Sequence, residues 1–160
     1  MNEVFVNMGQ IGVLRYTGVL VTVGLGSCVG VSLYDPSSKV GALAHVFLAK
    51  SRDNSNRELI PGKYADTAIP ALIDLAVKAG ANKHRFEAKI AGGAHLFNTF
   101  NADMPSVGQK NVEAVTAQLN KHNIPIIGKE VLGKHGRKMS LFIDSGIVVV
   151  TTIGQESIRI

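Results

Sequence analysis

The chain of 160 residues is long enough for one domain with a substantial core, since 46% of its residues are hydrophobic. Its single cysteine excludes an internal disulfide framework. Its formal charge of +5 is scattered, without the dense basic patch or recognisable module of a nucleic-acid-binding protein. The first residues lack the basic start and long apolar run of a secretory leader, and no apolar stretch is long enough to cross a bilayer. We therefore expect one domain over residues 1–160 of a cytoplasmic protein, with neither nucleic-acid binding nor membrane insertion.

The first third of the chain predicts β-strands. Its β-branched and apolar runs are Val19–Val23, Val29–Tyr34 and Val40–Phe47. Glycines separate the first two runs, and Asp35-Pro36-Ser37-Ser38 separates the last two. Because an aspartate followed by a proline suits the first two positions of a type I turn, we expect a hairpin with a four-residue loop.

The middle of the chain predicts a polar loop and then a helix. The loop covers Lys50–Arg57, and apolar residues recur at helical spacing over Tyr64–Ala79. Gly80 suits the C-terminal end of this helix. Pro70 conflicts with a continuous helix because proline lacks the backbone N–H. The helix is therefore expected either to begin later or to be kinked at this residue.

The last part of the chain predicts four strands and one helix. The expected strands are Phe86–Ala91, Ile124–Val131, Lys138–Asp144 and Ile147–Ile153, and the expected helix is Gly108–His122. A hairpin turn at Asp144-Ser145-Gly146 joins the last two strands. Because strands follow one another in runs and do not alternate with helices, the pattern favours an α+β domain over a doubly wound sheet.

Cys28 is the candidate nucleophile of a thiol hydrolase, and strand register selects its base. If Asp35–Ser38 form the hairpin loop, Tyr34 faces Lys39, and the pairing extends until Cys28 faces His45. Directly opposed residues share a sheet face, with β-carbons about 4.5–5.5 Å apart. A thiol and an imidazole so placed are the nucleophile and base that this chemistry needs. A slip of one residue would send them to opposite faces.

Two further features precede the nucleophile. The permissive backbone of Gly24-Leu25-Gly26-Ser27 leaves amides open, so we expect the N–H of Cys28 or of its neighbour to bind an oxyanion. Thr22 is a candidate for the third group, which orients the imidazole. A tight hairpin across the glycines would place Thr22 two strands from His45. Pairing of its strand beside the His45 strand would instead allow contact, and the sequence leaves both arrangements open.

Plainer interpretations stand beside these. A lone cysteine in an apolar strand is usually a small buried hydrophobe. Gly92-Gly93-Ala94-His95 resembles a turn more than a second active histidine, and His84, His122 and His135 have the polar neighbours of surface residues. No pair of histidines or carboxylates has metal-ligand spacing, so we expect no metal and no cofactor.

Four segments, in order along the chain, resemble the chemoreceptor glutamine deamidase CheD family. They are Val21-Thr22-Val23-Gly24-Leu25-Gly26-Ser27-Cys28-Val29, Gly41-Ala42-Leu43-Ala44-His45-Val46, Gly62-Lys63-Tyr64-Ala65-Asp66-Thr67-Ala68 and Lys89-Ile90-Ala91-Gly92-Gly93-Ala94. The resemblance implies a β-sandwich-like core of mixed or antiparallel strands flanked by two main helices, similar to deamidating-toxin cysteine hydrolases.

The resemblance also implies an activity and partners. Family members convert glutamine to glutamate on the cytoplasmic region of methyl-accepting chemotaxis receptors. The family's catalytic cysteine, histidine and threonine fall on Cys28, His45 and Thr22. The phosphatase CheC is the expected binding partner. Two alternatives remain: a regulatory protein acting mainly as a CheC partner, and another cysteine hydrolase acting on small amides.

Overall fold

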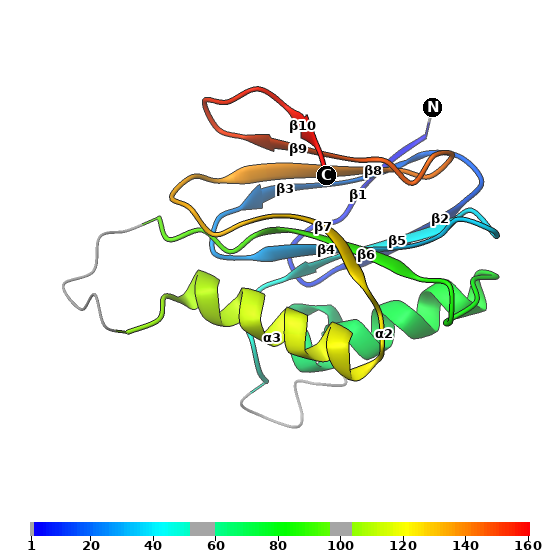
Figure 1. Cartoon of the computed structure of the whole chain (residues 1–160), viewed down its shortest axis with the longest axis horizontal. Coiled ribbons are helices and arrows are strands. Elements are labelled where there is room, and N and C mark those ends of the chain that lie inside the picture. Colours follow the sequence, from blue (N-terminus) through cyan, green and yellow to red (C-terminus); the bar gives the residue numbers. More distant parts are fainter. Residues whose placement is uncertain (1, 52–59, 97–103) are drawn as a thin grey trace.

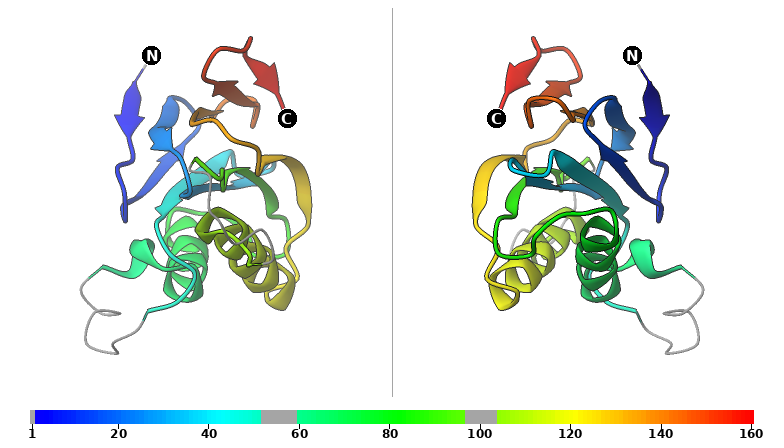
Figure 2. Two further views of the ribbon diagram at one scale, coloured as in Figure 1. Left: turned by 90° about the vertical axis from the view of Figure 1, so that its left-hand side faces the viewer. Right: turned by 90° about the vertical axis from the view of Figure 1, so that its right-hand side faces the viewer.

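The computed structural model describes residues 2–51, 60–96 and 104–160. Two five-stranded sheets face each other, and two helices cover the outer face of the second sheet (Figures 1 and 2). The expected α+β fold, with a sandwich-like core and two main helices, is confirmed. Within the described ranges, no helix has the length and apolar character needed to span a membrane.

Both sheets are mixed. The first runs in the order β1 (Glu3–Phe5), β3 (Val19–Leu25), β8 (Arg137–Phe142), β9 (Val148–Thr152) and β10 (Ile158–Arg159). The second runs in the order β2 (Ile11–Arg15), β5 (Val40–Val46), β4 (Val29–Asp35), β6 (Glu87–Gly92) and β7 (Ile126–Val131). The β1–β3 and β6–β7 pairs are parallel and the other pairs are antiparallel.

All the predicted strands are present, with ends that differ by a few residues. The hairpin turn between β8 and β9 is confirmed, and the Gly146 N–H donates to the Phe142 carbonyl across it. Sequence reasoning missed β1, β2, β10 and the short 3₁₀ helix η1 (Pro61–Lys63). The missed strands are all edge strands, and most are short, so their apolar pattern is weak.

Both predicted helices are present, as α2 (Ala65–Lys78) and α3 (Val107–Lys121). Because α2 begins at Ala65 and continues through Pro70, the expectation of a later start is wrong; the proline lies on the exposed side. Ser106 caps α3, where its hydroxyl accepts from the Gln109 N–H. Most of the polar loop expected over Lys50–Arg57 lies outside the described residues.

The central strands of the second sheet are buried on both faces. Every residue of β4 and β5 is buried, because the helices cover one face and the first sheet covers the other. On β4, Val29, Val31 and Leu33 face the helices. Gly30 faces the first sheet, where an added β-carbon would meet Met139, Leu25 and Thr22. The sheets therefore approach each other closely beside the start of β4.

The β4–β5 hairpin has its predicted loop length, but the loop is shifted by one residue. Asp35 pairs with Val40, so the loop is 36–39. The Asp35 carboxylate accepts from the Ser37 N–H, and Lys39 closes the loop with a left-handed φ of +53°. The aspartate thus acts as the last strand residue as well as the turn residue, which turn chemistry alone did not reveal.

The shifted loop changes every pair in the ladder. His45 pairs with Gly30 and Val46 pairs with Val29. The predicted pairing of Cys28 with His45 is therefore wrong by two residues. Because side chains alternate with a period of two, an error of two residues leaves each side chain on its predicted face.

Candidate active site

Cys28 and His45 face the same layer, between the two sheets. Cys28 lies in the loop between β3 and β4, is 5% exposed, and packs with apolar residues of that layer. His45 lies on β5 between Ala44 and Val46, which both face the helices. By alternation the imidazole faces the first sheet, where it is buried with 3% exposure. The structure thus brings the two residues into one layer without pairing them.

Thr22 reaches the imidazole from the other sheet. Its Oγ1 lies 2.7 Å from His45 Nδ1. Its strand, β3, pairs with β1 and β8 and not with β5. Both arrangements left open by the sequence are therefore wrong. The contact crosses the space between two facing sheets, which a single-sheet picture did not include.

The hydrogen bonds of Thr22 determine which nitrogen of the neutral His45 imidazole carries the proton. The Thr22 hydroxyl donates to the Val6 carbonyl oxygen at 2.7 Å. A hydroxyl has one proton, and a carbonyl only accepts, so Thr22 must accept its second bond from His45 Nδ1–H. In the neutral ring Nε2 then carries a lone pair. This buried atom has no hydrogen-bond partner in the part of the chain that the structure describes.

Burial favours the neutral form of both groups. It lowers the pKa of the His45 imidazole, an effect that the Val6 carbonyl partly offsets. It raises the pKa of the Cys28 thiol, an effect that the backbone amide of Cys28 partly offsets. Both shifts favour a neutral thiol and a neutral imidazole over a thiolate–imidazolium pair. Attack by the sulfur requires transfer of its proton to a base.

The backbone around Cys28 is held by neighbouring turns. The Gly93 N–H donates to the Cys28 carbonyl at 2.8 Å, and the Ala94 N–H donates to the Gly26 carbonyl at 2.8 Å. By contrast, the N–H groups of Ser27 and Cys28 donate to no backbone carbonyl within the described ranges. These are the free donors that an oxyanion site requires.

A pocket of about 380 Å³ adjoins the nucleophile loop, residues 26–28 between β3 and β4. Its wall includes Ser27, Phe47, Leu48, His95, Leu96 and Val107. Apolar side chains make up most of this wall, and Ser27, the residue before Cys28, forms part of it. Such a pocket suits a short aliphatic chain that ends in a polar group.

Asn111 is a contact of the site that the sequence analysis missed. It lies on α3 with 1% exposure, and its Nδ2 donates to the Ser27 carbonyl at 2.9 Å and to the Phe47 carbonyl at 3.0 Å. A sequence signal exists: Asn111 shares a helical stripe with buried Val115 and Leu119, at intervals of four residues. A lone polar residue on such a stripe needs a partner.

Three of the remaining histidines stand apart from this arrangement, whereas His95 lines the pocket. His84, His122 and His135 are exposed, as predicted. The turn predicted at Gly92-Gly93-Ala94-His95 is not found: Gly92 is the last residue of β6 and the residues after it are irregular, although both glycines have positive φ. Within the described ranges, no three histidine, cysteine or acidic side chains cluster closely enough to hold a metal ion.

Comparisons with known proteins agree on one family. The model of the family described as CheD chemotactic sensory transduction matches residues 47–152. A probable chemoreceptor glutamine deamidase CheD from Symbiobacterium thermophilum is 43% identical over 152 residues, covering 94% of this chain and 92% of that protein. The chemoreceptor glutamine deamidase CheD from Thermotoga maritima is 40% identical over 149 residues, covering 93% and 91%.

The family model begins two residues after His45, whereas the relatives' alignments cover too much of the chain to omit Thr22, Cys28 or His45. Among solved structures, the Bacillus licheniformis hypothetical protein YfiH aligns with a TM-score of 0.46 and 14% identity, over 72% of this chain and 47% of that one. A likeness this distant is no evidence of a shared activity.

Proposed function

This chain belongs to the CheD family, and from that premise we propose that it deamidates glutamine side chains of chemoreceptors, with Cys28 as nucleophile, His45 as base and Thr22 as the group that orients the imidazole. One observation carries the assignment of roles. Thr22 forms a hydrogen bond with His45 Nδ1. The lone pair of the buried Nε2, which lies in the same layer as Cys28, is therefore free.

The reaction follows from these protonation states. His45 Nε2 takes the proton of the Cys28 thiol as the sulfur attacks the glutamine side-chain carbonyl. The resulting oxyanion accepts hydrogen bonds from the free amides of Ser27 and Cys28. Protonated His45 returns its proton to the departing ammonia. Water, deprotonated by His45, then cleaves the thioester to give glutamate and restore the thiol.

The pocket beside the loop supports a glutamine side chain as substrate. Its apolar wall suits the two methylene groups of the side chain, and Ser27 in that wall is bonded to Cys28. The adjoining residues Leu96 and Val107 are 46% and 50% exposed, so the rim of the pocket is apolar as well. Such a rim favours a substrate residue held on the surface of a folded protein over a free, fully hydrated small amide.

The experiment that tests this function is mass spectrometry of a receptor cytoplasmic fragment incubated with the protein. We expect conversion of specific glutamines to glutamate, each with a mass gain of about one dalton, and no conversion with Cys28→Ala. The control is Ser157→Ala, at an exposed serine outside the pocket wall, which keeps the thiol. Full conversion by the Cys28 variant would contradict the mechanism.

CheC binding and a cytoplasmic location follow from the family resemblance and remain proposals. If the wild-type protein binds CheC in a pull-down and converts no receptor glutamine, the regulatory alternative replaces the enzymatic one. The free Nε2 and the adjoining pocket favour the enzyme, since a protein that only binds CheC needs neither.

A further inference from the structure

Asn111 joins the two strand ends that carry the proposed nucleophile and base. The ladder between β4 and β5 ends at the Val29–Val46 pair. The two carbonyls that accept from Asn111 Nδ2, those of Ser27 and Phe47, lie just beyond this pair, one on each side. Both protons of the amide nitrogen are therefore used at the point where the ladder stops.

The bond to the Ser27 carbonyl also fixes the amide of Cys28. The Ser27 C=O and the Cys28 N–H belong to one planar peptide, and in a trans peptide they point in opposite directions. The described residues contain no cis peptide bond. Because Asn111 holds the carbonyl toward α3, the Cys28 N–H points away from that helix. There it meets no backbone carbonyl within the described ranges.

This is the side of the second sheet on which the Cys28 side chain packs, in the layer between the two sheets. We infer that Asn111 is a positioning residue, whose amide orients the Ser27–Cys28 peptide so that the Cys28 N–H meets the substrate oxyanion.

A purely structural role for Asn111 would be an unfavourable choice. Its Oδ1 is buried and has no hydrogen-bond partner in the described part of the chain, which costs stability. An apolar residue in its place would match Val115 and Leu119 on the same stripe. An asparagine is favoured here only if its two donated hydrogen bonds have a function that apolar packing cannot supply. Orienting the Ser27–Cys28 peptide is such a function.

This inference rests on the proposed acyl transfer, so its test starts from wild-type protein that converts receptor glutamines. The test variant is Asn111→Leu, which has a similar volume, no charge and no donor. We expect kcat to fall at least ten-fold, toward the roughly 10²–10³-fold loss typical of removing one oxyanion donor. The KM should stay within about two-fold, since the pocket wall is intact.

Two further measurements distinguish a positioning role of Asn111 from a purely structural one. Alkylation of Cys28 by iodoacetamide forms no oxyanion, so its rate should stay within about two-fold of wild type. The backbone N–H resonance of Cys28 should move in a ¹H–¹⁵N spectrum. Val115→Ala, one helical turn away on the same buried face, is the control: it loses packing and should keep its kcat below its unfolding temperature.

Three results would overturn the inference: a kcat for Asn111→Leu within two-fold of wild type, an equal loss in Val115→Ala, or an alkylation rate that falls together with kcat. If Asn111→Leu does not fold, Asn111→Ala is judged by the same measurements. An inactive wild-type protein would instead contradict the proposed function, so the two failures are distinguishable.

Discussion

A threonine hydroxyl has one proton to donate, and the proposed site depends on where that proton goes. Thr22 donates this proton to the Val6 carbonyl and therefore accepts a hydrogen bond from His45 Nδ1–H. This order of donors leaves the lone pair on Nε2, the nitrogen without a partner in the described structure. Sequence reasoning named Thr22, but the deciding atom is a backbone carbonyl, which no side-chain pattern reveals.

Thr22→Val should therefore reduce activity more than Thr22→Ser. Valine has the same shape but leaves Nδ1 and the Val6 carbonyl without a partner, so the ring loses its fixed tautomer. We expect kcat to fall by about 100-fold in the valine variant, the lower end of the roughly 10²–10⁴-fold contribution of a general base, and to stay within about three-fold in the serine variant. Equal activities in the two variants would contradict the role of the hydroxyl.

The pH dependence of kcat/KM tests the neutral resting pair. Because burial lowers the pKa of His45, the base is unprotonated at neutral pH and becomes protonated only in acid. Activity should thus fall with decreasing pH, with a midpoint below the usual imidazole value of about 6.5. Because the pKa of Cys28 is raised, its alkylation should be slow at pH 7 and accelerate only in strong alkali. Rapid alkylation at pH 7 would indicate a preformed thiolate.

At the scale of elements, the site depends on how closely α3 approaches the nucleophile loop. The first turn of the helix contains Gly108, where an added β-carbon would collide with the carbonyl oxygens of Gly93 and Ala94. Gly93 and Ala94 in turn donate to the backbone around Cys28. The absence of a side chain at Gly108 thus lets α3 bring Asn111 to the Ser27 carbonyl.

Gly108→Ala should displace the start of α3 and lower both stability and kcat. Overpacking of this kind costs about 1–3 kcal/mol of unfolding free energy, measured by urea denaturation. The control is Ala117→Gly at an exposed position of α3, which weakens the helix by about 1 kcal/mol without moving it. Loss of kcat in the control as well would show that helix stability, and not its position, governs activity.

Most helices and strands could be predicted from the sequence, but the register of the β4–β5 hairpin and the contact between the two sheets could not. Long apolar runs and helical spacing revealed all but the short elements and β2, since those signals are local. The hairpin register failed by two residues because Asp35 both pairs with Val40 and caps the turn. The Thr22–His45 contact failed because it depends on two sheets packing face to face, and alternation along one strand cannot show which sheet lies opposite.

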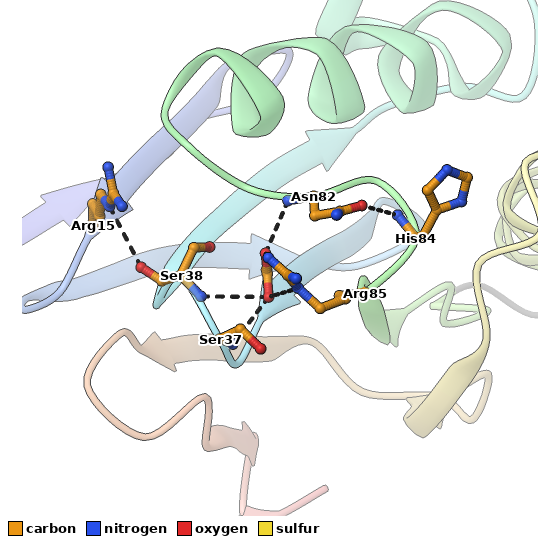
Figure 3. Close-up of polar contacts among 7 residues, drawn as sticks. Arg15, Ser37, Ser38, Asn82, His84 and Arg85 are labelled. Carbon is orange, nitrogen blue, oxygen red and sulfur yellow. Dashed lines mark hydrogen bonds and ion pairs between the residues drawn. The ribbon is translucent and has the colours of Figure 1, made fainter.

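At the scale of the whole molecule, the two ends of β4 have different tasks. Cys28 lies just before its start, and Asp35 lies at its other end, fully buried. There the carboxylate accepts from the amides of Ser37 and Asn82 and forms an ion pair with Arg85 (Figure 3). Burial alone would raise the pKa of Asp35, but these hydrogen bonds hold it at about 2.

Asp35→Asn should therefore lower stability and leave catalysis unchanged. The folded-state pKa lies below the usual value of about 3.8, so the carboxylate stabilises the fold above that pH by about 2 kcal/mol. This contribution is lost as the pH falls through about 2. Urea unfolding should show the difference between wild type and variant at pH 7, and the difference should shrink near pH 2. A constant difference at both pH values would contradict the ion-pair explanation.

The bond between Thr22 and His45 has a consequence for biosynthesis. Thr22 lies on β3, whose long antiparallel partner β8 lies near the C-terminal end of the sequence, while the hairpin that holds His45 is complete early. On the ribosome, the imidazole therefore lacks its orienting partner until the late strands emerge and the first sheet closes over the second. Cys28 is translated early, but we expect no deamidation before β8 has been made and has paired with β3.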